Sequence, residues 1–355
     1  MPVSGRYGMG EYARASAIAH ALIRRWPQAA VHFILSRAAP YAGGVPFPTT
    51  LLESSATFHT APVIEFIRAW RPHVVIFDNA GRTAQLKAAQ REGARIIYVS
   101  ARRRQRRKAF RLRWMRLIDE HWIAYPELIA GKLGVLERCK LKVMGRPVVR
   151  YLDVICSPAS PQRQAAVLAE AGGAPGGYVL VVPGGGTGHP GAGAAAAQFY
   201  AAARTLAARG LKTLFVGPTP LAGDAPLAAE APQSANLRAL GTLPQADLAA
   251  LMQGAHLVVA NGGSTLLQSL ACGAASIAVP VARDQAERVR RCVNLGVVLE
   301  APLEPERIAE AALALWHDEP ARAALADRAA GLKLTDGVET ALRALGRFIG
   351  AEAPG

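Results

Sequence analysis

The stretch HLVVANGGSTLLQSLACGAASIAVPVARDQAER, residues 256–288, joins two short apolar segments through two glycines and two hydroxyl side chains. The apolar segments HLVVAN (256–261) and SIAVP (276–280) lack alternating polar positions, which is typical of strands buried on both faces of a parallel sheet. Between them, TLLQSLAC (265–272) has the length and composition of a short helix. We therefore expect a strand, a helix and a second strand of an open α/β sheet.

The same alternation of apolar strands and helical segments runs through the chain of 355 residues. In the first half the expected strands are VHFILS, HVVIFD, RIIYVS and HWIAYP. In the second half they are YVLVVPGG, KTLFVG, LRALG, HLVVAN, SIAVP and GVVLE, separated by Ala-rich helical segments such as residues 194–210. This pattern predicts an α/β protein with two doubly wound, Rossmann-like parallel sheets.

The chain is long enough, and with 51% hydrophobic residues apolar enough, to form two cores. A further expected strand, LKVMG (141–145), precedes the segment YLDVICSPASPQ (151–162), in which two prolines indicate a linker. We therefore expect an N-terminal domain at 1–155, a C-terminal domain at 156–335 and a closing helix and tail at 336–355.

Several classes of protein are excluded by what the sequence lacks. No apolar run approaches the ~20 residues of a membrane span, and MPVSGRYGMG at the N-terminus lacks the charged and apolar regions of a signal peptide. The sequence thus predicts a cytoplasmic protein.

The cysteines have no metal-ligand spacing, so we expect buried free thiols at Cys139, Cys156, Cys272 and Cys292.

The positive charge of the chain lies in its first half. Residues 1–155 hold 26 Lys and Arg against 10 Asp and Glu, whereas residues 156–355 hold 15 against 16. This asymmetry predicts an anionic partner for the N-terminal domain, with nucleic acid, an anionic membrane surface and a phosphorylated substrate as the candidates.

Nine of these basic residues fall between Arg102 and Arg116. So dense a cluster favours an anionic membrane surface, and no helix-turn-helix, RRM or zinc pattern accompanies it, so we expect no nucleic acid. An apolar stripe at helical spacing runs through the same segment and favours core packing over membrane insertion. It consists of Phe110, Trp114, Leu117 and Ile118.

Each half begins with a glycine-rich loop, GRYGMGEYAR (5–14) and PGGGTGHPGAG (183–193). Glycines between a strand and a helix let the backbone approach a phosphate. Neither loop matches GxGxxG or a P-loop, so an ordinary tight turn is the alternative interpretation. Only residues 1–4 precede the first loop, where a sheet of this type has a central strand. Either this strand is very short or the sequence begins within it.

The turn at residues 262–265 adds hydroxyls to a glycine turn. Ser264 and Thr265 lie where the first amides of a helix have no partner, so they suit a phosphate, or Ser264 serves only as a helix cap. Gln268 follows one helical turn later on the same face. Asp284 and Gln285 begin another helix at the same carboxyl edge of the sheet, where α/β proteins bind ligands.

These residues resemble the donor-site motif of GT-B glycosyltransferases, in particular the family 28 group that includes the peptidoglycan N-acetylglucosaminyltransferase. The donor part of the likeness lies in NGGSTLLQSLACG and VPVARDQAERV, and GMGEYARASAIAHAL is similar to the N-terminal GxGHxxRxxxxAxxL loop and helix of that group. Related sugar-nucleotide hydrolases share the pattern. The resemblance implies the GT-B fold, in which two Rossmann-like domains face each other across a cleft.

The resemblance also implies roles for single residues in binding a nucleotide-diphospho-sugar. The diphosphate would be held by Gly263, Ser264 and Thr265 with Gly185, Gly186 and Thr187. Gln268 would bind the ribose, although the family usually has Glu there, and Gln supplies no charge. Asp284 and Gln285 would bind hydroxyls of the donor sugar, and Leu243 would contact the base.

Attack on an anomeric carbon needs a base for the acceptor hydroxyl and neutralisation of the departing diphosphate. The resemblance places Glu11 where the family commonly has the His base. Asp78, at the end of HVVIFD, is the other candidate base, or it caps a helix that begins near Arg82. No DxD occurs, so we expect neither a metal nor another cofactor.

We therefore expect an inverting glycosyltransferase of the hexosyltransferase type that uses a UDP-linked sugar and a lipid-linked, membrane-associated or anionic acceptor. Its expected location is the inner face of the cell membrane, as a peripheral protein. Two alternatives stay open. One is a sugar-nucleotide hydrolase or epimerase of the same fold, and the other is a catalytically weakened binding partner, because Gln268 and Glu11 depart from the family.

Overall fold

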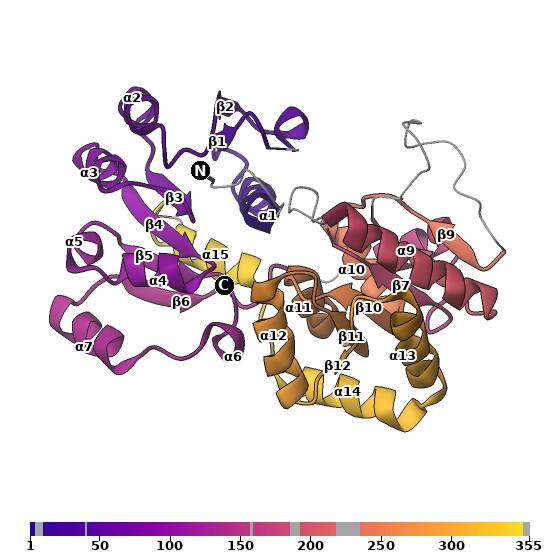
Figure 1. Ribbon diagram of the computed structural model, residues 1–355. Coiled ribbons are helices and arrows are strands. Elements are labelled where there is room, and N and C mark those ends of the chain that lie inside the picture. The colour runs from indigo at the N-terminus through magenta and orange to yellow at the C-terminus, as the bar shows by residue number, and fades with distance from the viewer. Residues whose placement is uncertain (4–9, 40, 157–158, 185–191, 218–234, 351–355) are drawn as a thin grey trace. The chain divides into compact units, whose positions relative to one another are not determined.

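The computed structural model describes residues 1–3, 10–39, 41–156, 159–184, 192–217 and 235–350 (Figure 1). The chain divides into two compact units. Unit 1 comprises Met1–Ile155 with Thr335–Gly355, and unit 2 comprises Cys156–Leu334. Among the described residues, no helix combines the length and the apolar composition that crossing a membrane requires.

Unit 1 is built on parallel strands: β1 (Phe33–Ser36), β2 (Thr49–Leu52), β3 (Val74–Asp78), β4 (Arg95–Ser100), β5 (Glu120–Ile123) and β6 (Val148–Tyr151). They are arranged as a pair, β1-β2, and a four-stranded sheet, β3-β4-β5-β6. Residues 2 and 3 join the two sets, because Pro2 pairs with Ile34 and Val3 pairs with Asp78. The N–H of Val3 donates to the Ile34 oxygen at 3.1 Å, and the N–H of Asp78 donates to the Pro2 oxygen at 3.0 Å. Residues 2 and 3 therefore occupy the place of the central strand expected before the first glycine loop.

Helices cover both faces of this sheet. They are α1 (Gly10–Arg25), α2 (Thr60–Trp70), α3 (Thr83–Arg91), α4 (Arg103–Ala109), α5 (Leu112–Met115), α6 (Glu127–Ala130), α7 (Val135–Met144) and α15 (Gly337–Gly346). On one face α1 and α15 pack their apolar residues against β1, β3, β4 and β5. On the other face α2, α3 and α5 do the same. The C-terminal helix α15 is thus part of the unit 1 core, and its residue Glu339 accepts two hydrogen bonds from Arg25 at 3.1 Å.

Unit 2 contains a six-stranded parallel sheet with the order β12-β11-β10-β7-β8-β9. Its strands are β7 (Val179–Val182), β8 (Thr213–Phe215), β9 (Leu237–Ala239), β10 (Leu257–Asn261), β11 (Ser276–Val279) and β12 (Leu299–Glu300). Its helices are α8 (Pro161–Ala171), α9 (Ala192–Ala208), α10 (Gln245–Gly254), α11 (Ser264–Ala271), α12 (Arg283–Asn294), α13 (Pro305–His317) and α14 (Glu319–Gly331). One face of the sheet packs against α9 and α13, and the other packs against α8 and α10. Both units are therefore three-layered.

Each of the ten strands expected in the two halves of the chain, four in the first and six in the second, overlaps an observed strand. The expected strand at 141–145 is wrong, because these residues form the last turn of α7 and its C-cap. Glu137 fixes the start of α7 by accepting from the Gly134 N–H at 2.9 Å, and Gly145 ends the helix with a left-handed φ of 65°. The real strand, β6, follows this cap. Cys139 lies on α7 and is exposed, so the expectation of a buried thiol is also wrong there.

Candidate functional site

The order of strands in unit 2 places a topological switch point between β7 and β10. From β7 the chain moves to β8 and β9 on one side, and it returns to β10 and β11 on the other. Ligands of open α/β sheets bind at the carboxyl ends of the strands where this reversal occurs. The end of β7 leads into the second glycine-rich loop, and the end of β10 leads into the turn at 262–263.

Asn261 ties these two glycine turns together. Its amide nitrogen donates to the Pro183 oxygen at 2.7 Å, and its Oδ1 accepts from the Gly263 N–H at 3.0 Å. A Cβ on Gly184 would lie 2.2 Å from Asn261 Nδ2, and a Cβ on Gly263 would lie 2.9 Å from Asn261 Oδ1. Glycine is required at both positions because the buried Asn261 side chain fills the space. Sequence reasoning placed Asn261 only as a strand end, although a polar residue directly before Gly-Gly was a usable signal.

The turn at residues 262–263 places the start of α11 at the carboxyl edge of the unit 2 sheet. Gly263 is the N-cap, and Ser264 and Thr265 are the first two helical residues. Ser264 is therefore not the cap, and its side chain is exposed, whereas Thr265 is buried. A glycine cap offers no side-chain acceptor to the first amides of the helix, so these amides and the helix dipole are available to an anion.

Helix α12 packs against the same turn. A Cβ on Gly262 would lie 2.5 Å from Val289 Cγ2 and 3.0 Å from Gln285 Cβ, so only glycine lets α12 approach this closely. Gln285 Oε1 accepts from the Val281 N–H at 3.1 Å, and Arg288 donates to the Gly262 oxygen. Arg288 was not predicted, although it lies one helical turn after the Asp-Gln pair.

The other predicted donor residues are placed as follows. Gln268 is half-buried on α11, one turn after Ser264, and Asp284 lies in the first turn of α12. Leu243 is half-buried before α10 and packs against the core on the α8 and α10 side. Gly185, Gly186 and Thr187 lie outside the described residues. The structure thus brings residues 263–265 and the start of α12 together at one edge.

Unit 1 has its own switch point, between the short strand at residues 2–3 and β3. Helix α1 follows the first of these strands, and Glu11 lies in its first turn. Asn79 directly follows β3 with a left-handed φ of 50°, a conformation in which Asn is enriched. Its amide nitrogen donates to Glu11 Oε1 at 3.1 Å, and its Oδ1 accepts from the Ala101 N–H at 2.9 Å. Asn79 therefore fixes the half-buried Glu11 carboxylate at the carboxyl edge of this sheet.

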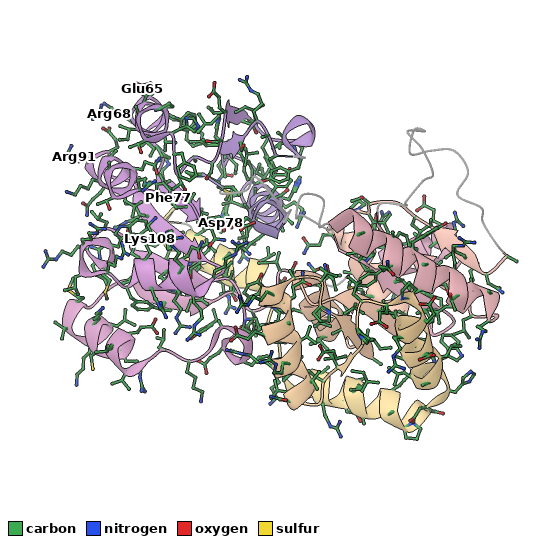
Figure 2. The ribbon with its side chains drawn as sticks, viewed as in Figure 1. Glu65, Arg68, Phe77, Asp78, Arg91 and Lys108 are labelled. Atoms are coloured by element: carbon green, nitrogen blue, oxygen red, sulfur yellow. The ribbon has the colours of Figure 1, made fainter. Side chains whose placement is uncertain are left out.

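Asp78 has a different environment (Figure 2). It is buried, and its two oxygens accept from Arg14 Nε at 2.9 Å and Arg14 Nη2 at 2.7 Å. Burial raises the pKa of Asp78 to about 6, and the Arg14 charge opposes that rise. The cap of α3 is Arg82, so Asp78 does not have the capping role. The ion pair anchors α1 to the end of β3.

Tyr41 adds a group that sequence reasoning did not find. Its ring stacks on Tyr12 with 4.2 Å between centroids, and its hydroxyl is buried without a hydrogen-bond partner among the described residues. Burial raises the pKa of Tyr41, and the charges of Glu11 and Asp78 raise it further. A buried hydroxyl near the Glu11 carboxylate can bind a polar group of a ligand.

The basic cluster divides into exposed and buried members. Seven arginines are exposed and form no ion pair within the described part of the chain: Arg102, Arg103, Arg104, Arg107, Arg111, Arg113 and Arg116. Arg106 is an exception, because its guanidinium pairs with Glu137 at 2.6 Å and is mostly buried. The expectation that Arg106 faces an anionic membrane surface is therefore wrong. Lys108 also turns inward, where it donates to the Gly81 oxygen at 2.7 Å (Figure 2). The predicted apolar stripe is confirmed as core, since all four of its residues are buried.

No protein-family model matches the sequence, and no curated protein matches it. The structure is nevertheless similar to solved glycosyltransferases over nearly its whole length. One is UGT2 of Phytolacca americana, solved with UDP-2-fluoro-glucose and pterostilbene, with a TM-score of 0.60 and 12% identity over 96% of this chain and 97% of that one. Another is MurG of Acinetobacter baumannii, with a TM-score of 0.59 and 15% identity over 96% and 97%. The chain has the GT-B fold, as the resemblance implied.

A third similar structure is assigned to another reaction. It comes from Listeria monocytogenes and is assigned as a UDP-N-acetylglucosamine 2-epimerase, with a TM-score of 0.58 and 13% identity over 98% of this chain and 96% of that one. At such low identities these likenesses establish the fold, and the chemistry has to be argued from the residues at the two switch points.

Proposed function

We propose that this chain is a metal-independent, inverting glycosyltransferase that moves a sugar from a UDP-linked donor to an acceptor hydroxyl. The observation that carries the proposal is the start of α11, where a glycine cap and two hydroxyl residues lie at the switch point of unit 2. UDP-2-fluoro-glucose in the similar plant structure supports the choice of donor. The motifs at 8–22 and 261–289 and the likeness to MurG support the family 28 group.

In unit 2 the chemistry is stabilisation of a leaving diphosphate. The amides of the first α11 turn, the hydroxyls of Ser264 and Thr265 and the helix dipole would interact with the negative charge that develops on the diphosphate. Asn261 and Arg288 would hold the turn in shape for this role, since each bonds to its backbone. Asp284, Gln285, Gln268 and Leu243 would bind the sugar, the ribose and the base as the family resemblance implies, together with Gly185, Gly186 and Thr187.

In unit 1 the chemistry is activation of the acceptor. Glu11 would accept the proton of the acceptor hydroxyl as the oxygen attacks the anomeric carbon, and one such displacement inverts the configuration. Within the described part of the chain, Asn79 holds Glu11 through one carboxylate oxygen, and the other would face the acceptor. Asp78 already accepts two hydrogen bonds from Arg14, so it is the weaker candidate for the base.

The acceptor is proposed to be lipid-linked or otherwise anionic and to be met at the inner face of the cell membrane. The seven exposed arginines of residues 102–116 support this, because unpaired guanidiniums attract anionic headgroups by ~1 kcal/mol each near a membrane. A sugar-nucleotide hydrolase or epimerase is the second candidate, and the similar Listeria epimerase structure favours it.

The experiment that separates these functions measures release of nucleoside diphosphate from a panel of nucleotide sugars, with and without a lipid extract. Lipid-dependent release of UDP supports the transferase. Lipid-independent cleavage identifies a hydrolase, and interconversion of the sugar without release identifies an epimerase. Nucleotide-sugar binding without any turnover identifies a binding partner.

UDP is expected to stabilise the fold without added metal, because a ligand that binds only the native state raises its stability. At 100 times Kd the gain is about 2.7 kcal/mol, which corresponds to several degrees in Tm. Ser264→Ala with Thr265→Val is expected to abolish the shift in a thermal melt. Thr205→Val is the matched control, because Thr205 lies in the last turn of α9, at the opposite edge of the sheet. An equal shift in the wild type and the double variant would remove this turn from the site.

A further inference from the structure

Helix α7 presents its apolar residues outward. Val135, Leu136 and Val143 are 66%, 75% and 84% exposed, Cys139 is exposed as well, and no residue of the helix is buried. Positions 135, 136, 139 and 143 follow helical spacing and share one face. A surface helix normally turns such a face toward the core, so the arrangement of α7 is the reverse of the usual one.

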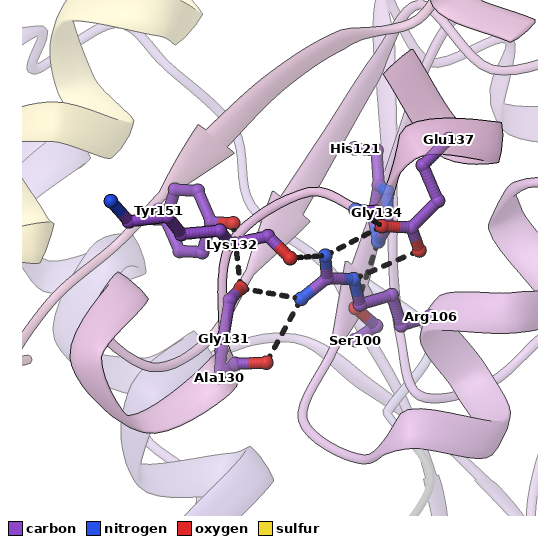
Figure 3. A network of polar contacts seen from close by, with 9 residues as sticks. All are labelled: Ser100, Arg106, His121, Ala130, Gly131, Lys132, Gly134, Glu137 and Tyr151. Atoms are coloured by element: carbon purple, nitrogen blue, oxygen red, sulfur yellow. Dashed lines mark hydrogen bonds and ion pairs between the residues drawn. The ribbon is translucent and has the colours of Figure 1, made fainter. Parts of the chain in front are cut away.

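Polar contacts hold α7 in this orientation from its inner side (Figure 3). Arg106 donates to the two carboxylate oxygens of Glu137 at 3.1 and 2.6 Å. The same guanidinium donates to the oxygens of Ala130, Gly131 and Lys132 in the preceding segment at 2.8 to 2.9 Å. One turn after Glu137, Lys140 donates to the Phe110 oxygen at 3.1 Å. The apolar face is therefore fixed outward by hydrogen bonds to α4 and to the segment after it.

Positive charge surrounds this face. Arg138 and Lys142 on α7 are exposed, and the contacts of Glu137 and Lys140 place the helix beside the exposed arginines of residues 102–116. Leu112, in the middle of those arginines, is 49% exposed. In Figure 1, α7 lies at the margin of unit 1, on the side of α5. Apolar and basic side chains thus share one region of the surface.

We propose that α7 is an interfacial anchor, which inserts Val135, Leu136 and Val143 into the headgroup region of an anionic bilayer while the neighbouring arginines bind lipid phosphates. Stable attachment to a membrane takes two signals, and here the apolar face and the basic cluster supply one each. This inference deepens the membrane part of the proposed function and names the element that contacts the lipid.

The charges argue against a second copy of the chain as the occupant of this face. A stable protein interface buries about 1,600 Å² in total, and the apolar part of α7 consists of three aliphatic side chains. A symmetric dimer would also bring two exposed arginine clusters together, and like charges repel. An anionic bilayer accepts both the apolar residues and the arginines.

Cys139 makes the proposal directly testable, because it lies on the apolar face, whereas Cys156 and Cys292 are buried and Cys272 is half-buried. The full chain is labelled at Cys139 with an environment-sensitive fluorophore, with Cys139→Ser as the labelling blank. Vesicles of phosphatidylglycerol and phosphatidylcholine are expected to shift the emission to the blue, and vesicles of phosphatidylcholine alone are not. Co-sedimentation of the unlabelled chain measures the affinity.

Val135→Ser with Leu136→Ser and Val143→Ser is expected to weaken vesicle binding roughly tenfold or more, since each loses buried apolar groups. Leu299→Ser, at an exposed apolar position of β12 in unit 2, is the matched control and is expected to bind like the wild type. UDP stabilisation is expected to be unchanged in the triple variant, because the replaced residues lie in unit 1 and the proposed donor turn lies in unit 2. Failure of the anchor is thereby distinguishable from failure of the proposed function.

Four outcomes would overturn the proposal. They are vesicle binding without a change at the Cys139 label, no binding to anionic vesicles, salt-sensitive binding to RNA in preference to lipid, and a dimer in light scattering that is lost in the triple variant.

Discussion

Glu11→Gln is expected to lower the turnover of sugar transfer by roughly 100-fold or more, which is the usual contribution of a general base. Gln has the shape of Glu and can still accept the hydrogen bond from Asn79, so the fold around α1 is expected to persist. Its side chain cannot take the proton of the acceptor hydroxyl. The measurement is the rate of nucleoside diphosphate release at saturating donor and acceptor, together with the UDP-induced shift in Tm, which is expected to match the wild type.

Asp78→Asn is the comparison that makes this result informative. It leaves Arg14 buried opposite a neutral amide, so its main expected effect is a loss of stability, because a buried charge without its partner is costly. An Asp78→Asn protein that stays folded and loses turnover, beside a Glu11→Gln protein of wild-type activity, would move the base to Asp78.

The strands and the glycine turns could be predicted because their signals are local. Runs of β-branched residues mark strands buried on both faces, and Gly-Gly followed by two hydroxyls marks a turn into a helix. The short edge strand β2 has only Leu52 buried and carries no such run, so it was missed. The strand before the linker was predicted at residues 141–145, because the apolar residues at the end of α7 have the composition of a strand. The observed strand, β6, follows at Val148–Tyr151.

The partners within each site could not be predicted, because they depend on which strands become neighbours. Asn261 bonds to Pro183, 78 residues away in the sequence, and Arg14 pairs with Asp78, 64 residues away. The sequence shows these residues as a strand end and as part of a helix. Only the sheet order brings the carboxyl ends of β7 and β10 together, and only the short strand at residues 2–3 brings α1 beside β3.

The outward face of α7 was also beyond sequence reasoning. Val135, Leu136 and Val143 are apolar, and apolar residues are expected to be buried. Their exposure follows from the hydrogen bonds of Arg106 and Lys140, which occupy the inner side of the helix. A count of arginines assigned Arg106 to the same surface as its neighbours, whereas its contacts make it a structural residue.

Arg106→Gln is expected to lower the free energy of unfolding of unit 1 by about 3 kcal/mol, the lower end of the cost of breaking a buried pair, because both side chains are partly exposed. The Arg106 side chain is 11% exposed and that of Glu137 is 20% exposed. Removing the guanidinium leaves the Glu137 carboxylate without its cation and three backbone oxygens without their donor. Urea unfolding followed by tryptophan fluorescence reports on unit 1, because four of the five tryptophans lie in it.

Arg107→Gln is the matched control, one residue along the same helix. Arg107 is exposed and forms no ion pair with the described residues, so its replacement is expected to change the unfolding free energy by less than about 0.5 kcal/mol. If both variants unfold alike, Arg106 does not hold α7 in place. Arg106 should therefore be kept when the basic surface of residues 102–116 is tested for membrane binding. Replacing the arginines at positions 102, 103, 104 and 107 by Gln removes charge from this surface, whereas replacing Arg106 as well would also release α7.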